Sequence, residues 1–201
     1  MSKTFLKALE NYEKEIASKI NKKGLTITVS GLSGVGKGTV AEALAKEFGL
    51  QKISSGDLFR KIAKERGVSL EELARSSTDD LDNQMERKTL QLTMRGGFVL
   101  DGRLTGMAAG SNADCRILIE CDMDEKAERV AKRDNLSIGE ARKKLEERDS
   151  GNSAKYFRIY GTDGMNKKFY DAVINTEKMS MDATKTEAIR IAHKVLKEKK
   201  S

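Results

Sequence analysis

The residues that carry redox, zinc and histidine chemistry are scarce in this chain of 201 residues. Its two cysteines, Cys115 and Cys121, lie six positions apart, a spacing that fits neither a Cys-x-x-Cys motif nor a zinc site. We therefore expect buried free thiols in a reducing compartment. The single histidine, His193, lies among lysines, and we expect it to be structural or exposed. The chain has no proline, and we have no physical account of that absence.

Long apolar runs and aromatic side chains are missing as well. No stretch of about 18 apolar residues is present, which argues against a membrane-spanning helix, and no signal peptide is visible. We expect a cytoplasmic protein with no membrane partner. Six Phe, four Tyr and no Trp leave little for stacking on nucleic-acid bases. We therefore also expect no nucleic-acid partner, with a basic nucleic-acid-binding module as an alternative.

Charge, in contrast, is abundant and unbalanced. Charged residues make up 34% of the chain and the formal net charge is +7, which favours polyanionic partners such as nucleotides. RNA or an anionic membrane would satisfy the same bias. The length is enough for one α/β domain with a mobile insertion. No repeat or low-complexity linker divides the sequence, so we expect one domain over residues 24–201.

The stretch Gly-Leu-Ser-Gly-Val-Gly-Lys-Gly-Thr at 31–39 carries the clearest chemical signal. It follows an apolar, β-branched run at 25–30 and leads into a helical pattern at 40–48, the context of a phosphate-binding loop. Its glycines allow successive N–H groups to turn inward, and the helix N-terminus adds partial positive charge. Lys37 would bridge the β- and γ-phosphates of ATP, and Thr39 could face a magnesium ion. The predicted ATP-binding residues are Gly31, Leu32, Ser33, Gly34, Val35, Gly36, Lys37, Gly38 and Thr39.

Apolar runs alternate with helical patterns along the rest of the chain. The predicted strands are 25–30, 51–55, 98–101, 115–121 and 171–175. The predicted helices include 79–95, 124–134, 137–160 and 182–199, and capping boxes mark helix starts at 69–72 and 137–140. Near-continuous apolar strands are typical of a buried parallel sheet, so the alternation predicts a three-layer α/β/α fold around five parallel strands. Residues 1–23 read as an amphipathic helix on the domain's flank, with a dimer contact or a surface anchor as alternatives.

Charged side chains follow the ends of two predicted strands. Arg60 lies one helical turn after Ser54–Asp57, and Arg103 directly follows the strand that ends at Asp101. Ligands gather at the carboxyl ends of strands in open α/β sheets. Phosphoryl transfer depends on positioning and positive charge there, and Asp101 is well placed to hold a magnesium-bound water.

Three motifs together resemble those of nucleoside monophosphate kinases. The loop with its Gly-Lys-Gly-Thr ending, Ser54–Arg60 and Val99–Gly106 come in the order and spacing of that family, and over residues 24–180 the chain looks most like the archaeal-type cytidylate kinases. The resemblance implies a P-loop kinase fold and transfer of the γ-phosphate of ATP, with Mg²⁺, to CMP or dCMP. AMP or UMP is the nearest alternative acceptor. A P-loop protein that switches a partner by hydrolysis is a further alternative, and it would not need the pair Arg60 and Arg103.

The resemblance also implies roles for individual residues. The positions matching Arg60 and Arg103 hold the acceptor monophosphate, and those matching Ser55, Gly56 and Asp57 open its pocket. Residues 129–160 would form a helical lid whose arginines approach the transferring phosphoryl group, and Lys155 stands where the family usually has an arginine. For each lid arginine the alternative is a surface pair with a glutamate. The lid arginines are Arg129, Arg133, Arg148 and Arg158, and the predicted catalytic set is Lys37, Arg60, Arg103, Arg133 and Arg148.

Two carboxylates could read the acceptor base. Asp82 and Glu86 are four residues apart and share one face of a predicted helix. The fold places that helix along the acceptor pocket, where a carboxylate can accept a hydrogen bond from the exocyclic amine of cytosine, which uracil lacks. The alternative is that both residues only solvate the helix. We expect a monomer that binds small nucleotides, with a dimer through the N-terminal helix as the alternative.

Overall fold

The computed structural model of the chain describes residues 11, 14, 21–22, 24–69, 72–73 and 79–199. The helix predicted for residues 1–23 lies almost wholly outside these residues, as does most of the helix predicted after Ser69. The Ser69 hydroxyl accepts a hydrogen bond from the backbone N–H of Glu72 at 3.0 Å, which is one half of the predicted capping box.

Five parallel strands form the sheet, as predicted, in the order β2-β3-β1-β4-β5. Each predicted strand is present with ends that shift by one residue at most. The strand order reverses beside β1, which opens a crevice at the carboxyl ends of the strands there. The bounds are β1 Thr26–Ser30, β2 Gln51–Ser54, β3 Phe98–Gly102, β4 Cys115–Glu120 and β5 Ala172–Asn175.

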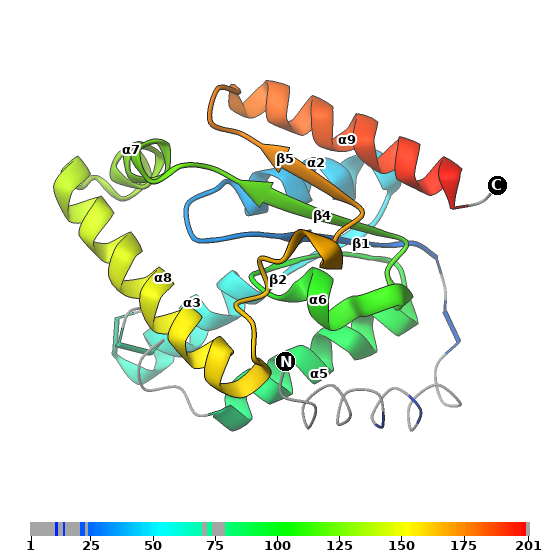
Figure 1. Ribbon diagram of the computed structural model, residues 1–201, viewed down its shortest axis with the longest axis horizontal. Helices are drawn as coiled ribbons and strands as arrows, with labels where there is room; N and C mark the ends of the chain where they lie inside the picture. Colours follow the sequence, from blue (N-terminus) through cyan, green and yellow to red (C-terminus); the bar gives the residue numbers. More distant parts are fainter. Residues whose placement is uncertain are drawn as a thin grey trace.

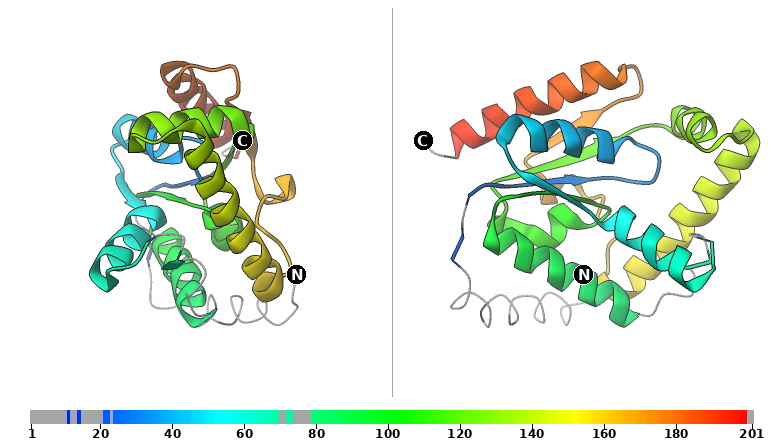
Figure 2. Two further views of the ribbon diagram at one scale, coloured as in Figure 1. Left: turned by 90° about the vertical axis from the view of Figure 1, so that its left-hand side faces the viewer. Right: turned by 180° about the vertical axis from the view of Figure 1, so that it is seen from behind.

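Helices cover both faces of the sheet and complete the three layers (Figure 1, Figure 2). On one face lie α2 (Lys37–Phe48) and α9 (Met181–Glu198), and on the other lie α5 (Asp79–Arg95) and the short α6 (Thr105–Ala109). The sequence analysis did not predict α6, which has only five residues. None of the helices in the described part of the chain has the length and apolarity needed to cross a bilayer.

Three more helices stand at the end of the sheet where the strands finish (Figure 1). They are α3 (Ser55–Arg66), α7 (Met123–Asp134) and α8 (Ile138–Tyr160). The predicted capping box at the start of α8 is confirmed, because the Ser137 hydroxyl and the Glu140 carboxylate each accept from the other residue's backbone N–H. Two 3₁₀ turns, η1 (Gly110–Asn112) and η2 (Lys167–Phe169), complete the elements.

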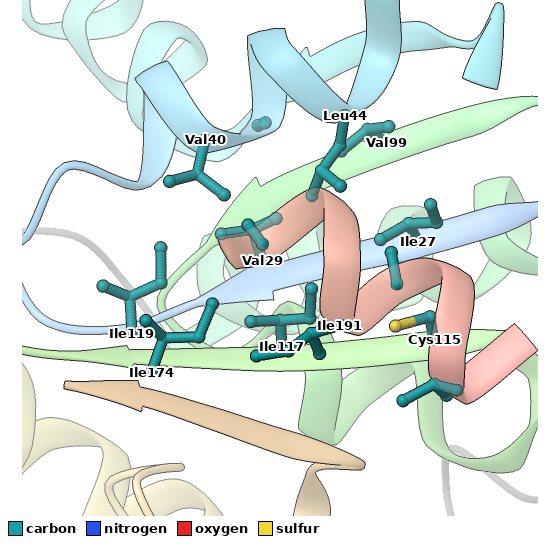
Figure 3. Packing of buried hydrophobic residues seen from close by; sticks show 14 of the residues in the cluster. Ile27, Val29, Val40, Leu44, Val99, Cys115, Ile117, Ile119, Ile174 and Ile191 are labelled. Carbon is teal, nitrogen blue, oxygen red and sulfur yellow. The ribbon is translucent and has the colours of Figure 1, made fainter. Parts of the chain in front are cut away.

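The main hydrophobic core lies between the sheet and the pair α2 and α9 (Figure 3). Apolar side chains of β1 and β4 meet Val40 and Leu44 of α2, because the buried strands carry β-branched residues facing that layer. Cys115 belongs to this core, and its burial raises the pKa of the thiol to about 12. Cys115 and Cys121 are both free, as expected, and Cys121 is partly exposed.

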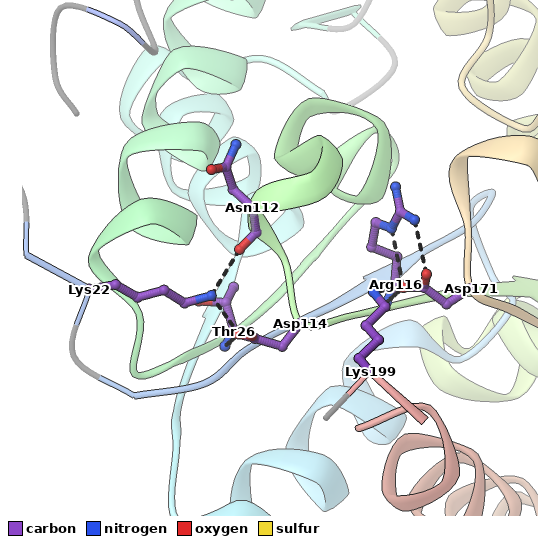
Figure 4. Close-up of polar contacts among 7 residues, drawn as sticks. All are labelled: Lys22, Thr26, Asn112, Asp114, Arg116, Asp171 and Lys199. Atoms are coloured by element: carbon purple, nitrogen blue, oxygen red, sulfur yellow. Dashed lines mark hydrogen bonds and ion pairs between the residues drawn. The ribbon is translucent and has the colours of Figure 1, made fainter. Parts of the chain in front are cut away.

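Two aspartates fix the opposite edge of the sheet, where the strands begin (Figure 4). Asp114 accepts hydrogen bonds from the Lys22 ammonium and from the backbone N–H of Thr26, each at 2.7 Å. Asp171 accepts from the Arg116 guanidinium at 2.9 Å and from the Lys199 ammonium at 3.0 Å. These contacts hold the amino ends of β1 and β4 in place. The carboxyl ends lie at the opposite side of the sheet, where ligands can bind.

Leu44→Ala should lower the free energy of unfolding by about 2–5 kcal/mol, because it leaves a cavity beside β1 where Leu44 is fully buried. Leu58→Ala on α3 is the matched control, since Leu58 is 41% exposed and the change should stay within about 0.5 kcal/mol. Urea unfolding followed by circular dichroism measures both. Equal losses for the two variants would contradict the placement of the core.

Candidate active site

A cleft of about 630 Å³ opens at the carboxyl ends of the strands. Its walls come from the glycine-rich loop after β1, the start of α3, the end of β3, and α5, α7 and α8. Most of the predicted site residues line this single cleft, although they are spread over more than 100 positions of the chain. The members from the predicted sets are Gly31, Ser33, Gly34, Gly36, Lys37, Gly38, Thr39, Ser55, Gly56, Asp57, Arg60, Glu86, Asp101, Arg103, Arg133 and Arg148.

The loop between β1 and α2 has backbone conformations that require glycine. Gly31 has φ +149° and a Cβ there would lie 2.5 Å from the carbonyl oxygen of Ile119. Gly36 has φ +92° and is the N-cap of α2, and it supplies no side chain to satisfy the first N–H groups of that helix. Those N–H groups and the helix dipole are therefore available to an anion in the cleft. Leu32 and Val35 belong to the loop without lining the cleft, and Val35 is buried.

Lys37 is held inside the loop at the first position of α2. Its ammonium donates a hydrogen bond to the carbonyl oxygen of Leu32 at 2.6 Å. Burial, followed by the charges of Arg103 and Arg148, lowers the pKa of Lys37 to about 7, although Asp101 opposes this. An anion beside this buried ammonium would favour its charged form, and phosphate oxygens are anions of that kind.

The predicted acceptor residues at the start of α3 lie on the other side of the cleft. The Ser54 hydroxyl caps the helix by accepting from the backbone N–H of Asp57 at 3.3 Å. The same hydroxyl donates to the Asp101 carboxylate at 3.0 Å, which ties the cap to the end of β3. Arg60 forms an ion pair with Asp57, and both side chains are more than half exposed. Arg60 is therefore free to exchange this weak surface partner for a ligand.

A carboxylate from α8, Asp149, lies where groups from three other segments converge. Its Oδ1 accepts from the Arg103 guanidinium and, at 3.4 Å, from the backbone N–H of Ser33. Its Oδ2 lies 3.1 Å from the Lys126 ammonium of α7. The side chains of Arg103, Asp149 and Lys126 are only 10%, 12% and 4% exposed. Burial alone would raise the pKa of Asp149, but the charges of Arg103 and Lys126 outweigh it and hold that pKa below its usual range.

Asp101 has the character of a ligand for a hard cation. It is 4% exposed, its Oδ1 accepts from Ser54, and its Oδ2 has no hydrogen-bond partner among the described residues. Burial raises the pKa of this carboxyl, while the Lys37 charge opposes the rise. Thr39, which carries a hydroxyl group, lines the same cleft. An orphaned carboxylate oxygen and a hydroxyl are donors that suit Mg²⁺.

The predicted lid arginines differ in their surroundings. Arg129, Arg133 and Arg148 line the cleft. Arg129 donates to the Glu125 carboxylate at 2.8 Å and to Thr176, and Arg133 pairs with its neighbour Asp134. Arg158 lies outside the cleft lining, because it pairs with Asp79 of α5 at 2.5 Å on the surface. Residue 129 falls inside α7, so the predicted lid segment begins within a helix.

The two acidic residues predicted to read the acceptor base, Asp82 and Glu86 on α5, have different surroundings in the structure. Glu86 lines the cleft, whereas Asp82 is only 2% exposed and lies 2.7 Å from the Lys155 ammonium of α8. Lys155 is thus a partner of Asp82, which agrees with its poor suitability for forked phosphate binding.

Several residues in or beside the cleft were not predicted. Asp149 directly follows Arg148, and an acidic residue beside a lid arginine was the only signal available for it. Lys126 looks like any other charged position of an amphipathic helix. Other additions lining the cleft include Lys52, Phe59, Met85, Asn152 and Tyr156.

The sheet order, the glycine-rich loop and the cleft define a P-loop kinase fold. Solved structures with this fold include a gluconokinase from Sinorhizobium meliloti 1021, with a TM-score of 0.60 and 16% identity over 89% of this chain and 97% of that chain. A shikimate kinase from Acinetobacter baumannii in complex with shikimate has a TM-score of 0.56 and 18% identity over 93% of this chain and 98% of that chain. Within this fold, the chain belongs to the cytidylate kinase-like family, whose family model matches residues 26–178.

Curated relatives agree with the family. A cytidylate kinase from Pyrococcus horikoshii is 39% identical over 158 residues, which cover 78% of this chain and 82% of the relative. A cytidylate kinase from Methanopyrus kandleri is 34% identical over 171 residues, covering 80% of this chain and 89% of the relative. The resemblance seen in the three motifs is therefore confirmed.

Asp149→Asn should lower the midpoint of thermal unfolding, because Arg103 and Lys126 would lose their compensating charge in a buried place. Removing one partner of a buried ion pair destabilises by about 3–5 kcal/mol. Scanning calorimetry with and without ATP and Mg²⁺ should show a smaller loss with nucleotide, since phosphates supply negative charge to the same groups.

The matched control is Asp124→Asn, which removes the partner of Arg142 in a pair whose side chains are 82% and 38% exposed. Exposed pairs contribute about 0–1 kcal/mol, so this variant should unfold close to the parent. Equal midpoints for the two variants would show that Asp149 does not hold α8 on the loop.

Proposed function

We propose that the protein is a cytidylate kinase that transfers the γ-phosphate of ATP to CMP or dCMP. The observation that carries the proposal is the cleft in which Lys37 of the loop and Arg103 of the β3 end meet, with Arg60 on the acceptor side. Two sets of cationic groups facing one cleft fit two phosphate-bearing ligands. The family and its relatives named cytidylate kinase support cytosine nucleotides as acceptors.

The donor side of the cleft binds by backbone and charge. The loop N–H groups and the start of α2 would hold the β-phosphate, and Lys37 would bridge the β- and γ-phosphates. Thr39 and Asp101 would hold Mg²⁺, which neutralises charge on the donor phosphates when it is bound. Binding of the triphosphate would also return Lys37 to its fully charged form, because phosphate oxygens oppose the lowering of its pKa.

On the acceptor side, Arg60 and Arg103 would hold the monophosphate, with Ser55, Gly56 and Asp57 at the pocket entrance. A monophosphate is already an anion at neutral pH, so the transfer needs no side chain to act as a base. The lid segment 129–160 would bring Arg133 and Arg148 onto the transferring phosphoryl group and exclude water. To reach the acceptor phosphate, Arg103 would exchange its contact with Asp149 for one with the substrate.

We also propose an oligomeric state and a cellular location for the protein. We expect a monomer that acts on small nucleotides, and the residues that line the cleft suit ligands of that size. Free thiols and nucleotide substrates support a cytoplasmic setting. A P-loop switch protein is disfavoured, because a switch has no use for paired arginines directed at a second phosphate.

A coupled assay of ADP formation with AMP, CMP, UMP, GMP and dCMP tests the proposal. ADP release should depend on the acceptor and be fastest with CMP or dCMP. Lys37→Ala is the control and should lower kcat by about 10²–10³, since it removes a charge aimed at the transferring group. ADP release that no acceptor alters would refute the kinase activity.

Arg103→Lys should raise the Kd for CMP by at least about tenfold while leaving the Kd for ATP within about threefold. Lysine keeps the charge but cannot form the forked pair with two phosphate oxygens. Titration calorimetry with each nucleotide separately measures the two affinities. An equal loss for both nucleotides would place Arg103 outside the acceptor site.

A further inference from the structure

Glu86 is a buried carboxyl group at the wall of the cleft, and one of its two oxygens is unpaired within the described part of the chain. It is 9% exposed, and its Oε2 has no hydrogen-bond partner among the residues that the structure describes. Met85 and Tyr156 line the cleft too, and they supply apolar surface of the kind that contacts a nucleobase. A buried polar atom left unpaired is costly, so this one points to a ligand that completes it.

Asp82, one turn earlier on α5, is in a different situation. Its carboxylate lies 2.7 Å from the Lys155 ammonium, and the two side chains are 2% and 7% exposed. Lys155 therefore serves as the counterion of Asp82 in the interior. Of the two carboxyl groups that the sequence singles out, only Glu86 faces the cleft.

The charge of Asp82 also affects the ionisation of Glu86. No ion pair involves Glu86 within the described residues, and the negative Asp82 lies on the same helix face. Burial first, and then the charge of Asp82, raises the pKa of Glu86 to about 8. The phenols nearby stay neutral because burial raises their pKa values too. The titratable and charged groups around Glu86 are Asp82, Lys155, Arg103, Tyr156, Tyr160 and Tyr170.

We propose that Glu86 binds the acceptor base as a neutral carboxylic acid, donating its O–H to N3 of cytosine and accepting from the exocyclic N4 amine. This inference rests on the proposed function. The two groups form adjacent, complementary hydrogen bonds on one base edge. An ionised Glu86 could accept from the amine, but it would place a second lone pair against the lone pair of N3.

The neutral form changes what Glu86 can select. Uracil offers an N3–H donor and an O4 acceptor, the reverse of the cytosine pattern, and a carboxylic acid matches it by exchanging the roles of its two oxygens. Glu86 therefore anchors the Watson–Crick edge of either pyrimidine. Glu86 in its neutral form would therefore not favour CMP over UMP, as an ionised carboxylate would. It would instead bind both bases, with an affinity that depends on pH.

The test compares two substitutions at this position. Glutamine is the isostere of the neutral acid, with one acceptor oxygen and an N–H donor, whereas leucine has neither. At pH 7, Glu86→Leu should raise the KM for CMP by at least about tenfold, with the KM for ATP unchanged, and Glu86→Gln should recover most of that loss. Glu86→Gln performing as poorly as Glu86→Leu, or Glu86→Leu matching the parent, would overturn the inference.

The pH profile gives a second, independent readout. The parent's KM for CMP should rise about tenfold per pH unit above the Glu86 pKa of about 8. Glu86→Gln should lack this rise, and comparing the two enzymes cancels the titration of Lys37 and of the nucleotides. Parallel profiles for the two enzymes would show that the protonated form of Glu86 is not the one that binds.

A measurement on the unaltered chain covers the case in which the variants do not fold. Titration calorimetry at pH 8.5, in buffers of different ionisation enthalpy, should show net proton uptake when CMP binds and less uptake with ribose 5-phosphate, which has no base. Equal uptake for both ligands would overturn the inference. Failure of the proposed function is distinct, because it would appear as no phosphorylation of CMP by the unaltered enzyme at pH 7.

Discussion

The site depends on positive charge that the fold concentrates at the ends of β1 and β3. The fold places three cationic groups in a partly buried region, namely Lys37, Arg103 and Lys126. Asp149 is the carboxylate in contact with both Arg103 and Lys126. Burial, followed by the charge of Arg103, lowers the pKa of Lys37, and these three cations leave an excess of positive charge beside Asp149. In a low-dielectric cleft such an excess attracts phosphate groups strongly, and it needs little reorganisation when the charge of the transferring group develops.

The rest of the structure makes this concentration of charge possible. The amino ends of β1 and β4 are fixed by Asp114 and Asp171, and the core beneath α2 holds the strands rigidly in register (Figure 3, Figure 4). At the other edge, Asp149 takes a position between Arg103 and the loop N–H of Ser33 where a phosphate oxygen could lie. In the proposed complex, a phosphate of the nucleotide would take the place of this carboxylate.

The sheet, the long helices and the glycine-rich loop could be predicted because their signals are local. Apolar strands, the cap at Ser137 and the loop from Gly31 to Thr39 each lie within a few residues of sequence. The short α6 could not be predicted, because five buried residues are too few to show a period. Arg60 and Arg103 could be placed from the strand ends, since parallel strands bring these ends together.

The contacts of the predicted lid, residues 129–160, could not be predicted in the same way. Nor could the different surroundings of Asp82 and Glu86. Asp82 and Glu86 share one helix face and have no local difference, so only the position of Lys155 from a distant helix separates their roles. The contact between Asp149 and Ser33 likewise joins segments 116 residues apart. Such contacts are decided by how α7 and α8 pack over the cleft, and helical periodicity contains no information about that.

We expect one cleft to hold the donor and the acceptor together, with the cationic groups between them. A compound that joins adenosine and cytidine through five phosphates at their 5′ positions tests it directly by titration calorimetry. The account predicts one molecule bound per chain, with an affinity at least about a hundredfold above that of ATP or CMP alone, because the second half binds intramolecularly. An affinity no greater than that of ATP, or two molecules bound per chain, would contradict it.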